Sequence, residues 1–239
     1  MTDIHSHILF DVDDGSKSIE ESIELLKKLK KIGFNNVILT PHYIKDSEYS
    51  SENKEKKQKI NELKEELINQ NIDINIFLGN EIFINNEIYD LIKEGQIHTL
   101  NNTRYILVEL PFHNEIVNLE DIIYELKIKG LIPIIAHPER YSFVKKDYKW
   151  VIPYIEMGVL FQGDYESLFG KYGNNANKTL RKLLKKNFIH FLGSDMHHKE
   201  SSLHTDEVKE ILKKLIKDDD KIEDILNNNF DKVIKNKTI

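Results

Sequence analysis

Ile132-Pro133-Ile134-Ile135-Ala136-His137-Pro138-Glu139-Arg140 joins an apolar run to a polar segment. The apolar residues are continuous rather than alternating, which is typical of a strand buried on both faces, as in a parallel sheet. A histidine, a glutamate and an arginine follow where this strand is expected to end. The stretch therefore predicts a buried parallel strand with polar chemistry at its carboxyl end.

Similar units repeat on both sides of this stretch. Apolar runs lie around residue 4 and at 37–39, 74–78, 105–108, 159–161 and 189–192, which makes seven predicted strands in all. Helical patterns are expected between them at 19–32, 52–67, 86–94, 119–129, 148–157 and 176–187, and two more helices are expected at about 205–217 and 221–236. Alternating strands and helices predict an α/β fold with a parallel sheet.

Seven units favour a closed or nearly closed barrel, and an open doubly wound sheet is the alternative. No low-complexity linker divides the 239 residues, so we expect one domain over 1–239, with the last two helices (about 205–236) packed on the barrel. The sequence has no Gly-x-Gly-x-x-Gly motif and no Walker loop, which weakens nucleotide-binding versions of the fold.

The composition excludes several kinds of site. The chain has no cysteine, so disulfides, zinc–thiolate sites, iron–sulfur clusters and a cysteine nucleophile are ruled out. The net charge of −6 argues against nucleic acid or an anionic membrane as the main partner. No signal peptide is visible, and no apolar run approaches the ~18 residues of a membrane span. We therefore expect a cytoplasmic protein.

Histidines and carboxylates follow nearly every predicted strand. The carboxyl ends of the strands share one face of an α/β barrel, and active sites are built there. The pairs His5/His7 and Asp195/His197 are each separated by one residue, and in extended chain such residues point to the same side. The side chains at these strand ends are His5, His7, His42, Glu81, Glu109, His137, Asp195 and His197.

These residue types together indicate a metal site. A single strand-end carboxylate such as Glu81 or Glu109 could instead cap the following helix. So many ionisable groups at one barrel mouth would, however, repel and desolvate each other without a cation. Imidazole and carboxylate ligands without thiolate suit Mn, Fe or Zn, and the sequence does not choose among them.

Several motifs, in order along the chain, resemble the polymerase-and-histidinol-phosphatase (PHP) superfamily. They are Asp3-Ile4-His5-Ser6-His7-Ile8-Leu9, Asp13-Asp14-Gly15, Thr40-Pro41-His42, Gly79-Asn80-Glu81, Ala136-His137-Pro138-Glu139-Arg140 and Ser194-Asp195-Met196-His197. Asp13-Asp14-Gly15, Ala136 to Arg140 and the stretch from Gln162 to Gly173 resemble its branch of bacterial capsule-associated tyrosine phosphatases, the CpsB/CapC/YwqE type. The resemblance implies a distorted (β/α)7 TIM-like barrel.

The resemblance also implies three divalent metal ions, with Mn expected first and Fe or Zn as alternatives. One ion would be held by His5, His7, Glu81 and Asp195. Glu81 would bridge to a second ion, held also by Glu109 and His137. Asp14, His42 and His197 would hold the third.

The function implied is a metal-dependent protein-tyrosine phosphatase, in which a metal-activated hydroxide attacks phosphorus and Arg140 stabilises the charge that develops. The expected partner is the tail of a bacterial tyrosine kinase of capsule or exopolysaccharide synthesis. Alternatives are a histidinol-phosphate phosphatase or other PHP phosphomonoesterase, a DNA exonuclease or polymerase accessory domain, and a catalytically silent metal-binding scaffold. The branch often has a second arginine after its last motif, for which Lys199 or His204 could substitute here.

Overall fold

The computed structural model describes residues 1–239 except 86–87, 95–97 and 200–204. It is an α/β fold in which every strand pair among the described residues is parallel. One sheet has the order β1 (Thr2–Asp3), β2 (Asn36–Leu39), β4 (Asn75–Leu78). The other has the order β3 (His42–Tyr43), β5 (Glu81–Phe83), β6 (Tyr105–Glu109), β7 (Ile132–Ala136), β8 (Leu160–Asp164), β9 (Phe191–Gly193).

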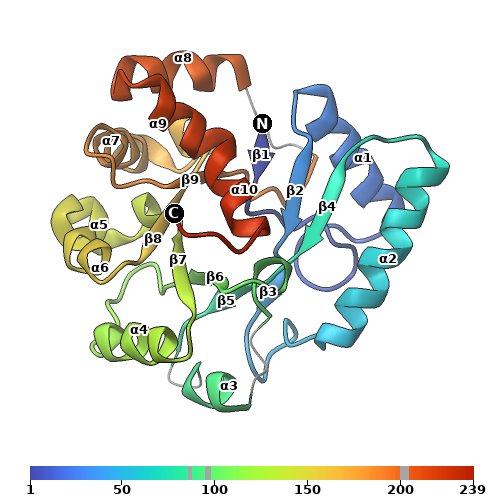
Figure 1. Ribbon diagram of the computed structural model, residues 1–239, viewed down its shortest axis with the longest axis horizontal. Coiled ribbons are helices and arrows are strands. Elements are labelled where there is room, and N and C mark those ends of the chain that lie inside the picture. The colour runs from blue at the N-terminus through green and yellow to red at the C-terminus, as the bar shows by residue number, and fades with distance from the viewer. Residues whose placement is uncertain (86–87, 95–97, 200–204) are drawn as a thin grey trace.

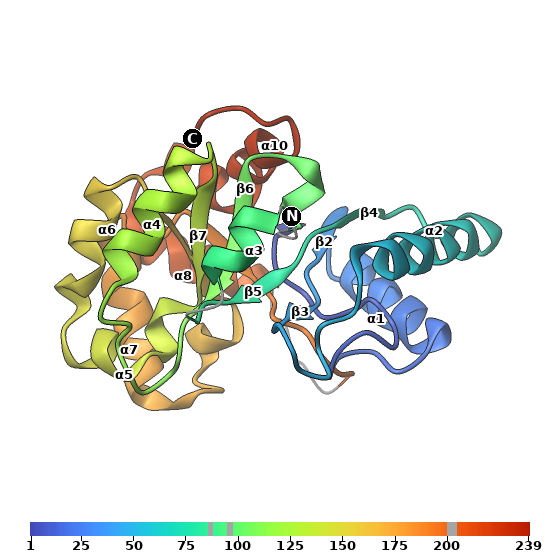
Figure 2. The same ribbon diagram turned by 90° about the horizontal axis from the view of Figure 1, so that it is seen from below.

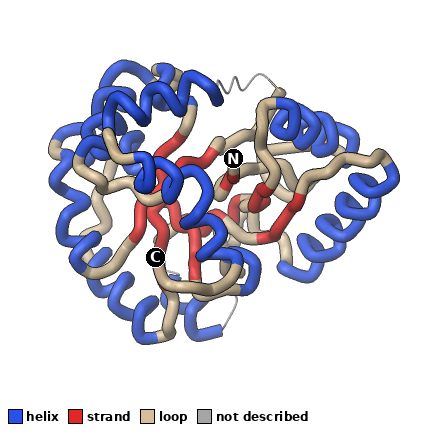
Figure 3. Tube along the Cα trace, turned by 45° about the horizontal axis from the view of Figure 1, so that its top comes forward, coloured by secondary structure: helices blue, strands red, loops and turns tan. Residues whose placement is uncertain are grey.

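The strands lie in the middle of the molecule and helices surround them (Figures 1, 2 and 3). The helices are α1 (Ile19–Lys31), α2 (Asn53–Asn69), α3 (Ile88–Glu94), α4 (Leu119–Ile128), α5 (Ser142–Lys146), α6 (Ile152–Glu156), α7 (Gly173–Lys185), α8 (Thr205–Ile216), α9 (Asp219–Glu223) and α10 (Asn229–Ile234). Short 3-10 turns include η1 (Leu100–Asn102), η2 (Pro138–Arg140), η3 (Tyr148–Val151) and η4 (Glu166–Phe169), and a π-turn, η5 (Asp224–Asn228), joins α9 to α10. No helix in the described part of the chain has both the length and the apolar character needed to cross a membrane.

Most of the apolar runs form buried strands, as predicted, although β4 has an exposed residue at Asn75 and the first strand lies at Thr2–Asp3, just before Ile4. All five residues of β6 and all five of β8 are buried. The expected capping box at the start of α1 is also present, because the Ser18 hydroxyl accepts a hydrogen bond from the backbone N–H of Glu21 at 3.3 Å. The helix expected over 148–157 is instead divided into η3 and α6, with Pro153 in the first turn of α6.

Two of the predicted strands are each followed, after a break of two residues, by a second short strand that the sequence did not predict. Thr40-Pro41 separates β2 from β3, and Gly79-Asn80 separates β4 from β5. Pro41 has no N–H to give to a ladder, and Gly79 lies so close to Leu100 that an added Cβ would be 2.5 Å from the leucine Cδ2. Both chain segments therefore pass from the smaller sheet to the larger one, where His42 and Glu81 stand opposite each other in register.

Backbone hydrogen bonds also join the two sheets at the edges formed by β1 and β9. The residues after β1 meet those after β9, where His7 N–H donates to Met196 O and Asp195 N–H donates to His5 O, both at 2.9 Å. Thr40 N–H donates to Ser6 O at 2.8 Å on the other side of the same segment. The segment from His5 to His7 is thus held between two neighbouring segments at the carboxyl ends of the strands.

Candidate metal centre

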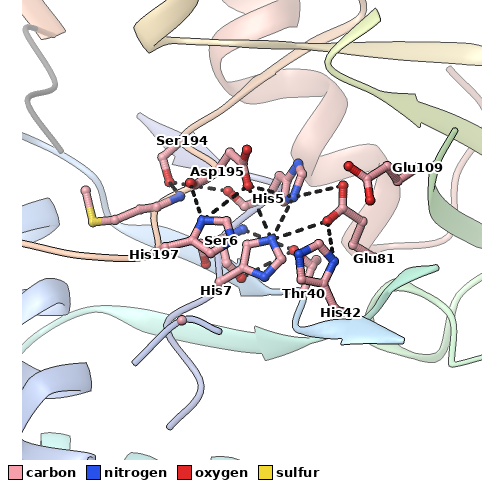
Figure 4. Close-up of polar contacts among 12 residues, drawn as sticks. His5, Ser6, His7, Thr40, His42, Glu81, Glu109, Ser194, Asp195 and His197 are labelled. Atoms are coloured by element: carbon pink, nitrogen blue, oxygen red, sulfur yellow. Dashed lines mark hydrogen bonds and ion pairs between the residues drawn. The ribbon is translucent and has the colours of Figure 1, made fainter. Parts of the chain in front are cut away.

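The nine side chains expected to hold metal lie together in one cluster. Each has a side-chain nitrogen or oxygen within 3.6 Å of one from another member. Figure 4 shows most of them converging from separate strand ends. The members are His5 and His7 after β1, Asp14 in the loop before α1, His42 in β3, Glu81 in β5, Glu109 in β6, His137 after β7, and Asp195 and His197 after β9.

The innermost group is His5, His7, Glu81 and Asp195, all buried. The two histidine Nε2 atoms are 3.1 Å apart. Both lie 3.3–3.4 Å from an oxygen of Glu81 and from Asp195 Oδ1. Two imidazole nitrogens and two carboxylates around one point are a ligand set that suits a divalent cation such as Mn, Fe or Zn. These are the four residues grouped by the family resemblance.

The outer nitrogens of the two histidines are bound by neighbouring side chains. His5 Nδ1 lies 2.8 Å from Gln162 Oε1, and His7 Nδ1 lies 2.7 Å from Asp13 Oδ2. Because each oxygen accepts the Nδ1 proton, the Nε2 lone pair of each ring is left to face the cluster. Asp13 and Gln162 were not predicted to have this role, although Asp13 adjoins Asp14 and Gln162 lies in a buried strand.

A second group surrounds Glu81. His42 Nδ1 lies 3.0 Å from Glu81 Oε2, and Glu109 completes a set of three whose ligand atoms are within 4.8 Å of each other. His137 Nε2 adjoins the same place, 3.1 Å from Glu81 Oε1 and 3.5 Å from Glu109 Oε1. In the geometric grouping His42 takes the place that the family resemblance gives to His137.

A third group lies toward the surface. Asp14 Oδ1 is 3.4 Å from His197 Nε2 and 3.6 Å from His42 Nε2, and His7 also belongs to this group. The Asp13-Asp14-Gly15 turn packs against the backbone of His7, since a Cβ added at Gly15 would collide with the His7 carbonyl oxygen. His197 Nδ1 lies 2.9 Å from the Asp195 carbonyl oxygen, which leaves Nε2 facing Asp14.

Unsatisfied buried atoms test whether these residues fit a cation. Asp14 Oδ1, His42 Nδ1 and Glu81 Oε2 are buried and make no hydrogen bond, even though the last two are only 3.0 Å apart. Buried polar atoms normally have partners, and lone pairs that approach without a hydrogen bond between them suit a shared cation. The nitrogen and carboxylate donor set also fits Mn, Fe or Zn.

The pKa shifts reflect how closely the acids are packed. Burial raises the pKa of Glu109 to about 9, and the charges of Glu81 and Asp195 add to this. Burial lowers the pKa of His137 to about 4, with Arg140 contributing. Burial also disfavours the cation of His5, but Glu81 and Asp195 outweigh it and raise its pKa to about 9. The carboxylates thus create a strong local demand for positive charge.

Arg140 lies at the edge of this cluster. His137 has a left-handed backbone (φ 33°), and η2 then carries Arg140 back toward it, with Arg140 N–H donating to His137 O at 3.0 Å. Its Nη1 lies 2.5 Å from Asp195 Oδ2. Of the two suggested substitutes for a second arginine, Lys199 pairs with Glu24 of α1, and His204 lies outside the described residues.

Asp13→Asn tests the support of His7. The asparagine can still accept the Nδ1 proton, but the lost charge makes the imidazole a weaker donor to metal. We expect metal affinity to fall by about 10–100-fold, measured by competition with a chelator. Asp11→Asn is the matched control, because Asp11 is exposed in the same loop and its carboxylate, among the described contacts, pairs with Lys59 and not with a proposed metal ligand. Equal affinity in both variants would exclude this role for Asp13.

Comparisons with known proteins identify the family to which the chain belongs. The family described as "Capsular polysaccharide synthesis, CpsB/CapC" matches residues 1–235. A putative tyrosine-protein phosphatase CapC of Staphylococcus aureus is 40% identical over 82% of this chain and 77% of its own length. Tyrosine-protein phosphatase YwqE of Bacillus subtilis is 32% identical over 100% of this chain and 93% of its own.

A solved structure gives the same relationship in three dimensions. It comes from a study of YwqE from Bacillus subtilis and CpsB from Streptococcus pneumoniae, described as metal-dependent tyrosine phosphatases. It covers 100% of this chain and 96% of its own, with a TM-score of 0.92 at 32% identity. The chain is therefore a member of the CpsB/CapC family of capsular polysaccharide synthesis.

Proposed function

We propose that the protein is a metal-dependent tyrosine-protein phosphatase that hydrolyses phosphotyrosine. The observation that carries this proposal is the cluster of five histidines and four carboxylates with an arginine at its edge. Relatives named as tyrosine-protein phosphatases at 32–40% identity support the choice of substrate class.

The proposed centre holds three divalent ions, Mn²⁺ first among the candidates. His5, His7, Glu81 and Asp195 hold one ion, and Glu81 is shared with a second site formed with Glu109 and His137. Asp14, His42 and His197 hold the third. Because His42 also faces Glu81, at 3.0 Å, it is placed to contribute to either of the last two sites.

Divalent ions bound in such a cluster lower the pKa of a bound water and polarise phosphoryl oxygens. The protein supplies the rest of the chemistry. The Arg140 guanidinium, on the rim beside Asp195, stabilises the negative charge that grows on the phosphoryl oxygens during in-line attack. A tyrosine phenol has a pKa of about 10, against roughly 15–16 for an aliphatic alcohol or water, so it leaves with little help from a general acid.

We propose further that the two sheets form a distorted (β/α)7 TIM-like barrel of the PHP type and that 1–239 act as one unit. The hydrogen bonds from His7 to Met196 and from Asp195 to His5 support closure, because they join the segments after the first and last strands. The last helices support the single unit, since Thr2 Oγ1 donates to the carbonyl of Leu226 in η5 at 2.7 Å.

The proposed partner is the tyrosine-rich tail of a bacterial tyrosine kinase of capsule or exopolysaccharide synthesis. The description of the family as capsular polysaccharide synthesis supports this choice. The cytoplasmic location expected from the sequence stays a prediction.

Substrate preference tests the proposal. The Mn²⁺-loaded protein is given a phosphotyrosine peptide and histidinol phosphate in parallel, and release of phosphate is measured. We expect kcat/KM for the phosphotyrosine peptide to be higher by more than about tenfold. A preference for histidinol phosphate would favour that phosphatase activity instead, and turnover of neither substrate by metal-loaded protein would favour a silent scaffold.

A further inference from the structure

The Arg140 guanidinium lies close to two aromatic rings. Its Cζ is 4.2 Å from the centre of the Tyr172 ring and 4.8 Å from the centre of the Phe112 ring. Phe112 follows β6, Arg140 follows β7 and Tyr172 follows β8, and these three strands are neighbours in the sheet. The arginine and its two flanking rings thus come from three adjacent strand ends.

The Phe112 ring packs against the metal cluster through His137. It stacks on the His137 ring with centroids 5.7 Å apart and an angle of 21° between the planes. Its backbone carbonyl accepts a hydrogen bond from Ser142 N–H at 2.8 Å, at the start of α5. Phe112 therefore links Arg140 to a proposed metal ligand.

Tyr172 lies in a turn that hydrogen bonds hold in place. Asp164 Oδ1, at the end of β8, accepts hydrogen bonds from the N–H groups of Glu166 and Ser167, which anchors η4. Gly170 (φ 86°) and Gly173 (φ 88°) have left-handed backbones, and Gly173 N–H donates to Gly170 O at 2.9 Å. The turn they enclose points the Tyr172 ring at Arg140.

Contact with two aromatic rings suits the function of an arginine that binds phosphate. The faces of a guanidinium favour aromatic rings, while its N–H groups lie in the plane and stay available at the edge. One edge atom, Nη1, already contacts Asp195 at 2.5 Å. A long, flexible side chain held in this way loses less conformational freedom when it binds an anion.

Arg140 has no second arginine beside it at the metal cluster. The chain has three arginines, and the other two lie elsewhere: Arg104 donates to Thr238, and Arg181 donates to Asn177 and to the carbonyl of Leu168. The segment after the last motif, 198–204, contains no arginine. Arg140 is thus the one arginine at the metal cluster.

We propose that Tyr172, together with Phe112, is a positioning residue that holds the Arg140 guanidinium for the substrate phosphoryl group. The inference rests on the proposed phosphatase function. Tyr172 acts through its ring face, so its hydroxyl is not required.

The test compares Tyr172→Leu, which removes the aromatic face, with Tyr172→Phe, which keeps it. In metal-loaded protein we expect Tyr172→Leu to lower kcat for a phosphotyrosine peptide roughly tenfold and to weaken inorganic phosphate binding by a similar factor. Tyr172→Phe should stay within about twofold of the wild type in both. Metal content and melting temperature are measured for each variant and are expected to be unchanged. Equal kcat and phosphate affinity in wild type and Tyr172→Leu would overturn the proposal.

A double-mutant cycle then asks whether Tyr172 acts through Arg140. We expect Tyr172→Leu to have no further effect when Arg140 is already alanine, because the positioned group is gone. The same loss in both backgrounds would overturn the proposal and assign Tyr172 a separate role.

The phosphate measurement separates this inference from the function on which it rests. If the wild type hydrolyses no phosphotyrosine, the proposed function fails. Phosphate affinity can still be measured by calorimetry on the metal-loaded proteins. If Tyr172→Leu weakens phosphate binding only when Arg140 is present, the positioning role is supported. Any other result overturns it.

Discussion

Glu81→Gln is expected to lower phosphotyrosine hydrolysis by at least about 10³-fold, the scale of losing the several kcal/mol that a metal centre contributes to the transition state. Glu81 is at the centre of the cluster, with its two oxygens 3.0–3.4 Å from His5, His7, His42 and His137. The glutamine is similar in size but carries an NH₂ donor and no charge. It cannot serve as an anionic ligand shared between two ions.

Two readouts separate loss of metal from loss of fold. Elemental analysis of the purified variant should show fewer ions per chain, while its circular dichroism should match the wild type. Glu210→Gln is the matched control, because Glu210 is an exposed residue of α8 whose pairing with Lys213 spans 3.8 Å. Full activity and full metal content in Glu81→Gln would contradict the arrangement of ligands proposed here.

Arg140→Ala is expected to lower kcat by ~10²–10³ while metal binding is kept, the usual effect of removing one donor to a developing charge. The guanidinium borders the cluster but is not among the groups of ligand atoms, so its loss should leave the ions in place. The variant also removes a cation from beside Asp195, so metal affinity should stay the same or rise slightly. Steady-state kinetics with a phosphotyrosine peptide and elemental analysis measure the two effects.

Arg104→Ala is the control for this variant. It also removes one arginine, but Arg104 lies before β6 and donates to Thr238 near the C-terminus. Its kcat should match the wild type. Near-normal kcat in Arg140→Ala would show that this arginine takes no part in the mechanism. It would also contradict the positioning role proposed for Tyr172.

Much of the fold could be predicted from the apolar runs, because a strand buried on both faces has a simple signature. The run at 132–136 became β7 as expected, and the run at 105–108 became most of β6. The short strands β3 and β5 were not predicted. They depend on tertiary contacts, such as that of Gly79 with Leu100 just before β5, which no local pattern records.

The position of the cluster was also predictable. Residues two apart in extended chain share a side, and His5 and His7 do bring their Nε2 atoms to 3.1 Å. The groups behind the ligands were harder to find. Gln162 contacts His5 from 157 residues further along the chain. Both Gln162 and Tyr172 lie in the stretch from Gln162 to Gly173 that resembles the family branch, but no local pattern shows which residues they contact. Such roles depend on which strand ends become neighbours, and that is decided by the assembled sheet.

Divalent metal bound by this cluster is proposed to be what allows the protein to hydrolyse phosphotyrosine. The most direct test is to strip the protein with a chelator, add back Mn²⁺ in steps, and measure bound metal per chain together with hydrolysis of a phosphotyrosine peptide. We expect the stripped protein to be inactive and activity to return as the sites fill, up to three ions per chain. Hydrolysis that persists in fully stripped protein, or a chain that retains no Mn²⁺, would contradict it.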